Sequence, residues 1–141
     1  MGKNLDKVEI PDKLIQDKQY IYKLCLQKKK EYIGFFENKQ TVGKLPKRLW
    51  KHINKRGAKY TKKYKPKIEE NILQCTIHNA NTNPFAHEMF YTLQRMNYRG
   101  INNVRGGPFT WVRDYDTKEK IVINFFIDEM KKGWNSFVDC Y

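Results

Sequence analysis

A chain of 141 residues is long enough for one domain with its own core, and its 14% of aromatic residues argues against disorder although 30% of the residues are charged. The formal net charge of +13 favours a polyanionic partner, which means nucleic acid or an anionic membrane surface. No apolar run approaches the roughly 20 residues of a membrane span, so the sequence predicts no membrane-spanning segment.

Two short segments rich in aromatic and branched residues lie near the beginning of the chain, at 20–26 and 31–36. The QKKK between them is short and polar, which is typical of a hairpin connection, and we predict two antiparallel strands. Each strand carries a tyrosine triplet, Tyr20-Ile21-Tyr22 and Tyr32-Ile33-Gly34. Such tyrosines either pack across the hairpin as ordinary strand residues or present their phenols to a phosphate.

The next segment is strongly basic, because residues 44–67 contain eleven Lys or Arg and no acidic residue. A solvated surface usually mixes both signs of charge, so this run favours phosphate binding with packing of the interleaved aromatic rings. An ordinary soluble surface is the alternative, whereas a membrane-surface helix is disfavoured because Gly57 and Pro66 interrupt the run. The candidate nucleic-acid contacts are Lys44, Lys47, Lys51, Lys55, Arg56, Lys59, Tyr60, Lys62 and Lys63.

The middle of the chain contains signals for a helix and a third strand. Pro46 can occupy the first turn of a helix that ends near Asn54, and Gly57 lies just past that end. Residues 70–78 (ENILQCTIH) are rich in branched and apolar residues, which predicts a strand. We expect this strand to complete a small sheet with the hairpin.

Two longer helices are predicted in the second half of the chain. Asn83-Pro84 suits the cap and first turn of a helix that runs to about Asn97. Asp116 with Glu119 is the pattern of a capping box for a last helix, which Gly133 would stop. The predicted buried stripe of the earlier helix consists of Phe85, Met89, Leu93 and Met96. The elements together predict a mixed α/β (α+β) fold, with a small, mainly antiparallel, three-stranded sheet flanked by helices.

The three cysteines, Cys25, Cys75 and Cys140, are scattered and form no CxxC pair, which indicates free thiols in a reducing compartment. Because the first residues also lack a signal-peptide pattern, we expect an intracellular protein, in the cytoplasm or nucleus, without a membrane partner. The C-T-I-H at 75–78 and the nearby His87 suggest zinc, but a fourth ligand at a useful spacing is missing. We therefore expect no structural zinc.

Five features follow one another along the chain: the triplets at 20–22 and 32–34, Arg48, His52 and Glu88. This ordered set resembles the GIY-YIG endonuclease superfamily. The triplets are similar to its naming motifs on the first hairpin, and Arg48 and His52 to the arginine and histidine of its first helix. Glu88 is similar to its metal-binding glutamate on a later helix. A single triplet would carry no weight, whereas the ordered set is a strong signal.

The resemblance covers roughly residues 18–110, which leaves 1–17 as an N-terminal extension and 111–141 as a C-terminal helical extension packed on the same domain. RGAKYTKKYKP at 56–66 is similar to the segment found in repair and resolvase members. INNVRGGPF at 101–109 is similar to a stretch in standalone members from large DNA viruses, where the host cell would be the place of action. The implied fold is that of a GIY-YIG nuclease.

The resemblance implies a DNA endonuclease that uses Mg²⁺ or Mn²⁺. Tyr22 would be the general base on water, with Tyr32 assisting by hydrogen bonding, and Arg48 would clamp the scissile phosphate. The remaining candidates are His52 as a proton relay or donor, Glu88 as the metal ligand and Asn103 as a brace for the site.

These residue types suit phosphodiester hydrolysis, which needs an activated water, a counter-charge for the phosphate and a proton for the leaving oxygen. A free phenol has a pKa of about 10, so a tyrosine base needs cationic neighbours such as Lys28–Lys30, Arg48 and a divalent ion. Arg48 and His52 are four residues apart and therefore share one helix face. A single carboxylate, Glu88, suffices for Mg²⁺ where water and a substrate phosphate complete the shell.

Each candidate also has an ordinary structural role. Tyr22 and Tyr32 can pack across the hairpin. Arg48 and His52 can belong to a solvated helix face, Glu88 can be an acid near a helix N-terminus, and Asn103 can be a turn residue. For the whole chain, the alternative function is a non-catalytic nucleic-acid-binding module, and an RNA-binding translation accessory rests on charge alone. DNA is the expected partner, contacted mainly through its phosphates, and the pattern leaves the oligomeric state open.

Overall fold

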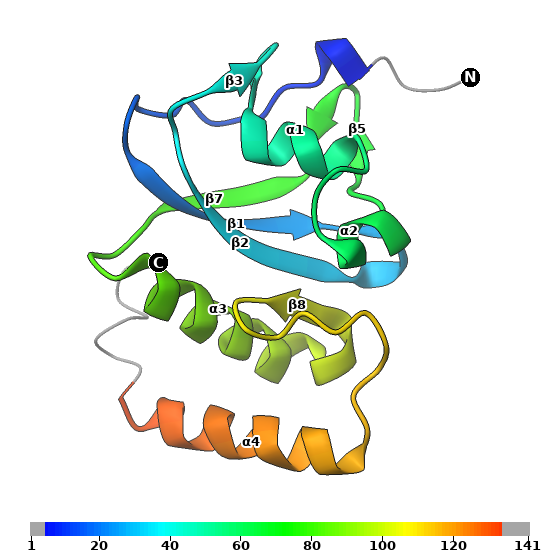
Figure 1. Cartoon of the computed structure of the whole chain (residues 1–141), viewed down its shortest axis with the longest axis vertical. Helices are drawn as coiled ribbons and strands as arrows, with labels where there is room; N and C mark the ends of the chain where they lie inside the picture. Colours follow the sequence, from blue (N-terminus) through cyan, green and yellow to red (C-terminus); the bar gives the residue numbers. More distant parts are fainter. Residues whose placement is uncertain (1–4, 134–141) are drawn as a thin grey trace.

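The computed structural model describes residues 5–133, which form a mixed α+β fold around one mainly antiparallel sheet (Figure 1). The strands lie in the order β7-β1-β2-β8, with bounds β1 Gln19–Cys25, β2 Glu31–Glu37, β7 Cys75–Asn79 and β8 Val104–Gly106. β1 is antiparallel to both β2 and β7, whereas β8 is parallel to β2. The predicted α+β class and hairpin are therefore present, but the sheet has four strands and not three.

Four helices, three 3-10 turns and two small β-ladders surround this sheet in the described residues. The helices are α1 Lys47–Ile53, α2 Lys59–Lys63, α3 Pro84–Arg99 and α4 Thr117–Lys131, with 3-10 turns η1 Leu5–Lys7, η2 Gln27–Lys29 and η3 Ile101–Asn103. Two small ladders pair β3 Thr41–Val42 with β4 Leu45–Pro46, and β5 Ile68–Glu69 with β6 Ile72–Leu73. Within the described residues, no helix is long and apolar enough to cross a membrane.

The predicted strand at 70–78 is not continuous, because 70–71 form a turn and Ile72–Leu73 form β6, which pairs with β5. Glu70 and Asn71 have positive φ angles of 50° and 64°, and they form the turn between β5 and β6. Two successive residues in the left-handed region are the requirement of a tight hairpin turn, so the chain reverses here before β7 begins at Cys75. Only the second half of the segment pairs with β1.

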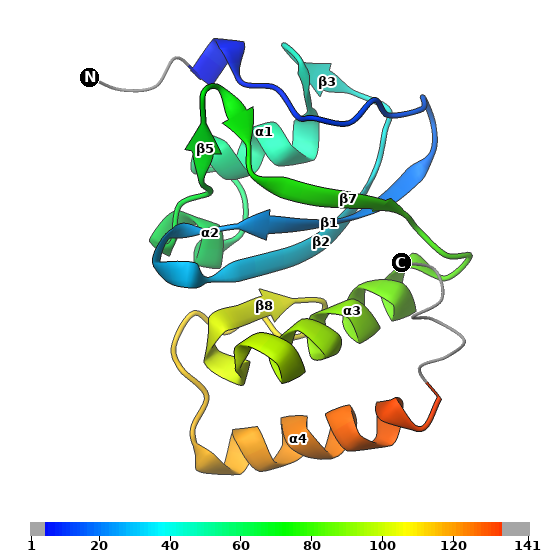
Figure 2. The ribbon, with the colours of Figure 1, turned by 180° about the vertical axis from the view of Figure 1, so that it is seen from behind.

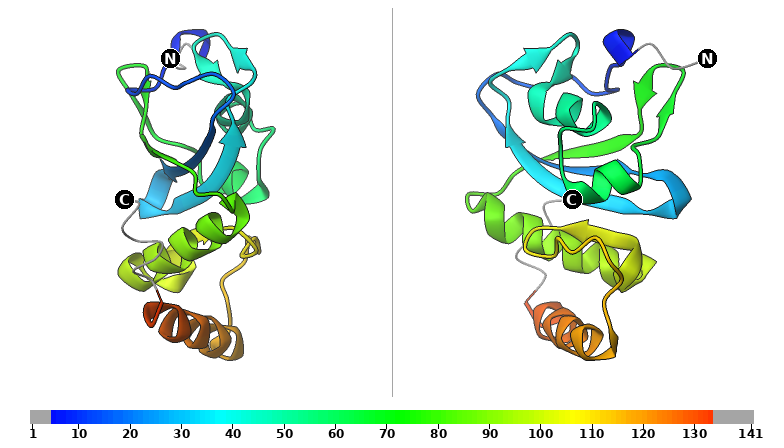
Figure 3. Two further views of the ribbon diagram at one scale, coloured as in Figure 1. Left: turned by 90° about the vertical axis from the view of Figure 1, so that its left-hand side faces the viewer. Right: turned by 45° about the vertical axis from the view of Figure 1, so that its right-hand side comes forward.

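The sheet separates two cores, because successive residues of a strand face opposite sides. Tyr22 and Tyr32 pack with Leu49 of α1 on one side, which α1 and α2 cover (Figure 3). Ile21 and Ile33 pack on the other side, in the core that includes α3 and α4. α4 packs on α3, which lies between it and the sheet (Figures 1 and 2). The phenols of both triplets are thus directed to the side of the first helix.

The predicted starts of α3 and α4 are confirmed, and α3 ends at Arg99, two residues beyond the predicted Asn97. The Asn83 side chain accepts a hydrogen bond from Ala86 N (3.1 Å), and Asp116 with Glu119 forms a complete capping box at the start of α4. The buried stripe of α3 is correct for Leu93 and Met96, and Met89 packs partly buried at its edge. Phe85 is not part of the buried stripe: it lies in the first turn of α3, is 69% exposed and packs its ring on Phe35 of β2 (ring centres 5.0 Å apart).

Both ends of the described chain pack on this domain. Val8 is buried in the core on the α1 side, and Glu9 forms a bridge with Ile72. Ile123 and Ile127 of α4 are buried in the core beside α3. Cys25 and Cys75 carry free thiols, and Cys140 lies outside the described residues.

Candidate active site

A chain of buried hydrogen bonds starts at the first triplet. Tyr22 Oη lies 2.6 Å from His52 Nε2, and His52 Nδ1 lies 2.9 Å from Thr61 Oγ1. The Thr61 hydroxyl donates its only proton to the Ala58 carbonyl (2.9 Å), so Thr61 Oγ1 must accept from His52 Nδ1–H. The neutral imidazole then has a bare Nε2, which accepts the Tyr22 O–H. The Tyr22 hydroxyl therefore donates its proton to His52 Nε2, which is unprotonated and can act as a base.

Burial and the charge of Arg48 lower the pKa of His52 to about 3. The side chain is only 1% exposed, so its charged form would lose most of its hydration. His52 is consequently neutral around pH 7, which keeps Nε2 available as an acceptor.

This lowered pKa predicts an acid-sensitive fold. The unfolded His52 takes a proton near pH 6.5 and the folded one does not, so stability is complete above pH 6.5 and falls as the pH drops toward 3. Between pH 7 and pH 5 this one group should remove about 2 kcal/mol from the free energy of unfolding. Urea unfolding at both pH values should show that much additional loss in the parent relative to His52→Gln. Equal losses in the two proteins would mean that His52 titrates normally.

Arg48 lies beside both phenols. Burial raises the pKa of Tyr22 and of Tyr32, and the charge and hydrogen bonding of Arg48 act in the opposite direction. The Tyr22 and Tyr32 ring centres are 6.5 Å apart, and that of Tyr32 is 5.1 Å from His52. Tyr22 is 0% exposed and Tyr32 6% exposed, so both hydroxyls are protonated in the free protein and Tyr22 is shielded from solvent.

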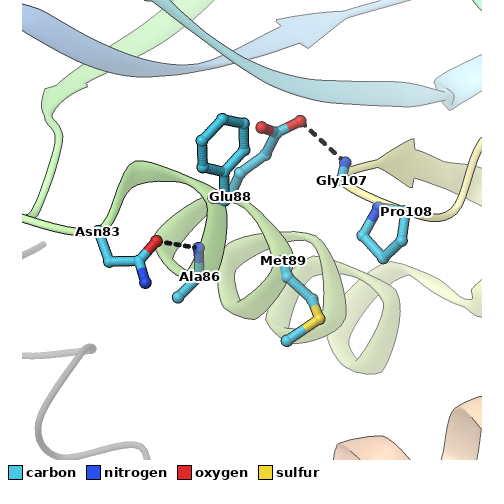
Figure 4. Close-up of a pocket in the computed structure, with 7 residues that line it drawn as sticks. Asn83, Ala86, Glu88, Met89, Gly107 and Pro108 are labelled. Carbon is cyan, nitrogen blue, oxygen red and sulfur yellow. Dashed lines mark hydrogen bonds between the residues drawn. The ribbon is translucent and has the colours of Figure 1, made fainter.

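Glu88 reaches the same group from α3. Its Oε1 accepts a hydrogen bond from Gly107 N (3.0 Å), just beyond β8, and it lines a cavity of about 560 Å³ with Met89 and Pro108 (Figure 4). Burial raises the pKa of Glu88, whereas the Gly107 N–H and Arg48 lower it. Its charge is also felt by both phenols, whose pKa values it raises.

Glu88 is the one carboxylate that the described residues near the phenols offer as a ligand for a magnesium-type ion. Among the described residues, no group of three or more His, Cys, Asp or Glu side chains could hold an ion. Glu88 is a single carboxylate at a cavity wall, and Gly107 engages only its Oε1. Mg²⁺ is commonly held by one or two carboxylates, with water and phosphate oxygens completing the octahedron. Glu88 meets that minimum.

Two glycines permit the close packing around the hydrogen-bonded chain. Gly34 pairs with Tyr22 across the hairpin, and a Cβ there would overlap the Tyr22 hydroxyl. A Cβ at Gly57 would overlap His52 Nδ1. The glycine of the second triplet is therefore needed for space next to a phenol.

Gly57→Ala should lower the free energy of unfolding by about 1–3 kcal/mol, because the added methyl displaces the His52 ring or the backbone at 57. Gly133→Ala is the matched control, since a Cβ at Gly133 meets nothing within 4 Å. Chemical denaturation of the two variants checks this, and a Gly57→Ala protein as stable as Gly133→Ala would contradict the packing described.

The structure brings together five of the six predicted site residues: Tyr22, Tyr32, Arg48, His52 and Glu88. Asn103 is engaged elsewhere, where its Oδ1 accepts from Lys30 Nζ (2.9 Å) and its Nδ2 donates to the Arg99 carbonyl (2.7 Å). Lys30, predicted to supply positive charge to the tyrosines, is thereby held against η3.

Most of the candidate nucleic-acid contacts lie on the surface. The exposed ones are Lys44, Lys47, Lys55, Arg56, Lys59, Lys62 and Lys63, and Lys51 is half-buried. Tyr60 is different, since it is 2% exposed, packs on Tyr64 (ring centres 5.0 Å apart) and lies near Arg105. The ring of Tyr60 belongs to the core under α2 and also lines a cavity beside Tyr32 and Trp111, so a contact of this residue with nucleic acid stays a prediction.

Thr61 and Arg105 are the main residues that the sequence did not single out. Thr61 sets the tautomer of His52, yet it is one hydroxyl inside a lysine-rich run. Arg105 is fully buried next to Tyr60, in a strand too short to produce a sequence pattern. Thr61 lies nine residues from His52, and Arg105 donates to carbonyls six and eight residues further on, and neither spacing belongs to a regular helix or strand pattern.

No protein-family model, no curated protein and no solved structure matches this chain. The geometry described above, together with the motifs at 20–22 and 32–34, is therefore the basis for a functional assignment.

Proposed function

We propose that this protein is a metal-dependent endonuclease of the GIY-YIG type, which hydrolyses DNA phosphodiester bonds inside the cell. The observation that carries the proposal is the hydrogen bond that Tyr22 donates to a neutral His52. Arg48 and Glu88, which the ordered motifs place in the same site, interact electrostatically with the Tyr22 phenol. Such a pair also satisfies two buried polar groups in an ordinary core, so the proximity of Arg48 and Glu88 is what favours catalysis over a purely structural role.

In this mechanism Tyr22 Oη takes a proton from the attacking water while its own proton passes to His52 Nε2, which becomes a stronger base when the Arg48 charge moves to the phosphate. Thr61 keeps Nδ1 protonated, so the accepting nitrogen stays on the Tyr22 side. Tyr22 is fully buried in the free protein, and Arg48 interacts with both phenols. The mechanism therefore includes a movement of Arg48 toward the incoming phosphate, which opens the phenols to water.

Arg48 suits the phosphate because its planar guanidinium matches phosphate oxygens and keeps its charge; the pKa of Arg48 is raised further by the two tyrosines despite its partial burial. Tyr32 lies beside His52 and lines an open cavity, so it can hydrogen-bond the phosphate or the water. Glu88 would hold Mg²⁺ or Mn²⁺, which supplies positive charge to stabilise the phosphate and the leaving oxygen.

DNA is the proposed polymer because exposed Lys and Arg side chains cluster on α1, α2 and the segment between them. Contacts of this type neutralise phosphates, so affinity should fall as salt rises. A plot of the logarithm of the binding constant against the logarithm of the salt concentration should have a slope of about −0.9 per contact. Such contacts position the backbone without selecting a base sequence.

The test is to incubate the purified protein with plasmid, flap, junction and single-stranded DNA, with Mg²⁺ or with EDTA. Mg²⁺-dependent cleavage of at least one substrate is the expected result. Salt-sensitive binding without cleavage of any of them would identify the alternative, a non-catalytic nucleic-acid-binding module.

A further inference from the structure

A buried arginine fixes the loop that follows β8. Arg105 is 0% exposed and forms no ion pair within residues 5–133. Its guanidinium donates to the carbonyl oxygens of Trp111 (Nε, 2.6 Å) and Arg113 (Nη2, 3.0 Å), and it stacks 4.2 Å from the Tyr115 ring centre. Burying a charge is costly unless its donors are satisfied, and here loop carbonyls satisfy them. The backbone at 111–113 is therefore held in one place.

This fixed loop presents an aromatic ring to solvent. Trp111 is 61% exposed, and the Arg113 guanidinium lies 5.2 Å from its ring centre. Arg113 is itself held by a two-pronged pair with Glu119 (2.7 and 2.9 Å) at the start of α4. The ring is thus supported by a cation and anchored through its own carbonyl, while most of its surface is open.

The ring borders a cavity that also contains a residue of the candidate active site. Trp111 and Arg113 line about 560 Å³ of space together with Tyr32, Lys59 and Tyr60. Tyr32 lies beside His52, so a group bound in this cavity is next to the phenol proposed to hydrogen-bond the phosphate or the water. Lys59 is exposed at the same wall and offers a positive charge for a neighbouring phosphate.

We propose that Trp111 stacks on an unpaired nucleobase adjacent to the scissile phosphate, so that the preferred substrate is DNA with an unpaired nucleotide at the cleavage position, such as a flap. Both faces of a base inside a duplex are covered by its neighbours, so an aromatic side chain can stack only on a base that has left the duplex. This inference rests on the proposed endonuclease function, because it places the base subsite beside the Tyr32 phenol.

The test uses a flap oligonucleotide with 2-aminopurine as the unpaired nucleotide at the junction, bound in EDTA to the full-length Tyr22→Phe protein so that cleavage is suppressed during the measurement. Stacking quenches 2-aminopurine emission. We expect the Tyr22→Phe protein to quench the emission and the double variant Tyr22→Phe/Trp111→Ala not to quench it. The double variant should bind the flap about 10- to 100-fold more weakly and plain duplex with unchanged affinity. Trp111→Phe, which keeps a ring, should restore most of the quenching.

Tyr98→Ala is the matched control. Tyr98 is also an exposed aromatic (76%) with an arginine over its ring (Arg95, 5.1 Å), but it lies at the end of α3 and outside this cavity. The Tyr22→Phe/Tyr98→Ala protein should quench 2-aminopurine and bind the flap as the Tyr22→Phe protein does. Unchanged quenching and affinity in Trp111→Ala would overturn the base subsite. Trp111-dependent quenching by a parent chain that cleaves no DNA would support the subsite and refute the nuclease, so the two failures are distinguishable.

Discussion

Glu88→Gln should cleave DNA about 10²- to 10⁴-fold more slowly than the parent while binding it with the same affinity. Glutamine keeps the shape of the side chain and an oxygen that can accept the Gly107 N–H bond, so the fold around it is preserved. It removes the negative charge that would hold the divalent ion. Single-turnover rates at saturating DNA, measured across a Mg²⁺ titration, give the answer.

Glu129→Gln is the matched control for this change. Glu129 is a half-exposed glutamate on α4 whose side chain forms a surface ion pair with Lys132 (3.0 Å). Its loss should leave both rate and affinity unchanged, since such pairs contribute about 0–1 kcal/mol. Unaltered Mg²⁺-dependent turnover in Glu88→Gln would remove Glu88 from the metal site.

Tyr22→Phe should lower the cleavage rate by about 10²- to 10⁴-fold, because it deletes the oxygen that exchanges protons with water and His52. The ring is kept, so packing on Tyr32 and Phe36 is preserved. The buried His52 Nε2 loses its partner, which costs about 1–3 kcal/mol of stability, so the assay belongs well below the unfolding temperature.

Tyr20→Phe provides the control within the same strand and face. Its hydroxyl accepts a hydrogen bond from Ile15 N (2.8 Å) and takes no part in the His52 chain. Cleavage by Tyr20→Phe should match the parent. If Tyr22→Phe also cleaves at the parent rate while Tyr32→Phe does not, the general base is Tyr32, the more accessible of the two phenols.

Local sequence signals predicted much of the fold. The hairpin, the Asn83 cap and the Asp116–Glu119 capping box depend on neighbouring residues, and each is present. β8 was not predicted because its pairing is parallel and only three residues long, so it produces no alternating pattern. The break at Glu70-Asn71 was missed because neither residue is glycine, the usual residue for a positive φ.

The part of the candidate site that could be predicted from the sequence is the set of residues whose types suit phosphodiester chemistry. The structure brings both tyrosines, Arg48, His52 and Glu88 together, as their order along the chain suggested. The burial of Tyr60 was not predicted, because an aromatic ring among lysines has the same local pattern whether it is buried or exposed. The support from Thr61, Arg105 and the Trp111 loop arises from contacts that no spacing in the sequence encodes.

The most direct test of the proposed catalysis is nicking of supercoiled plasmid by the parent and Glu88→Gln proteins, purified in parallel and compared in Mg²⁺ and in EDTA at equal DNA occupancy. Nicking by the parent only, and only with Mg²⁺, is the result we predict. Equal nicking by both preparations, or tight binding by the parent without any nicking, would contradict the assignment of this chain as an endonuclease.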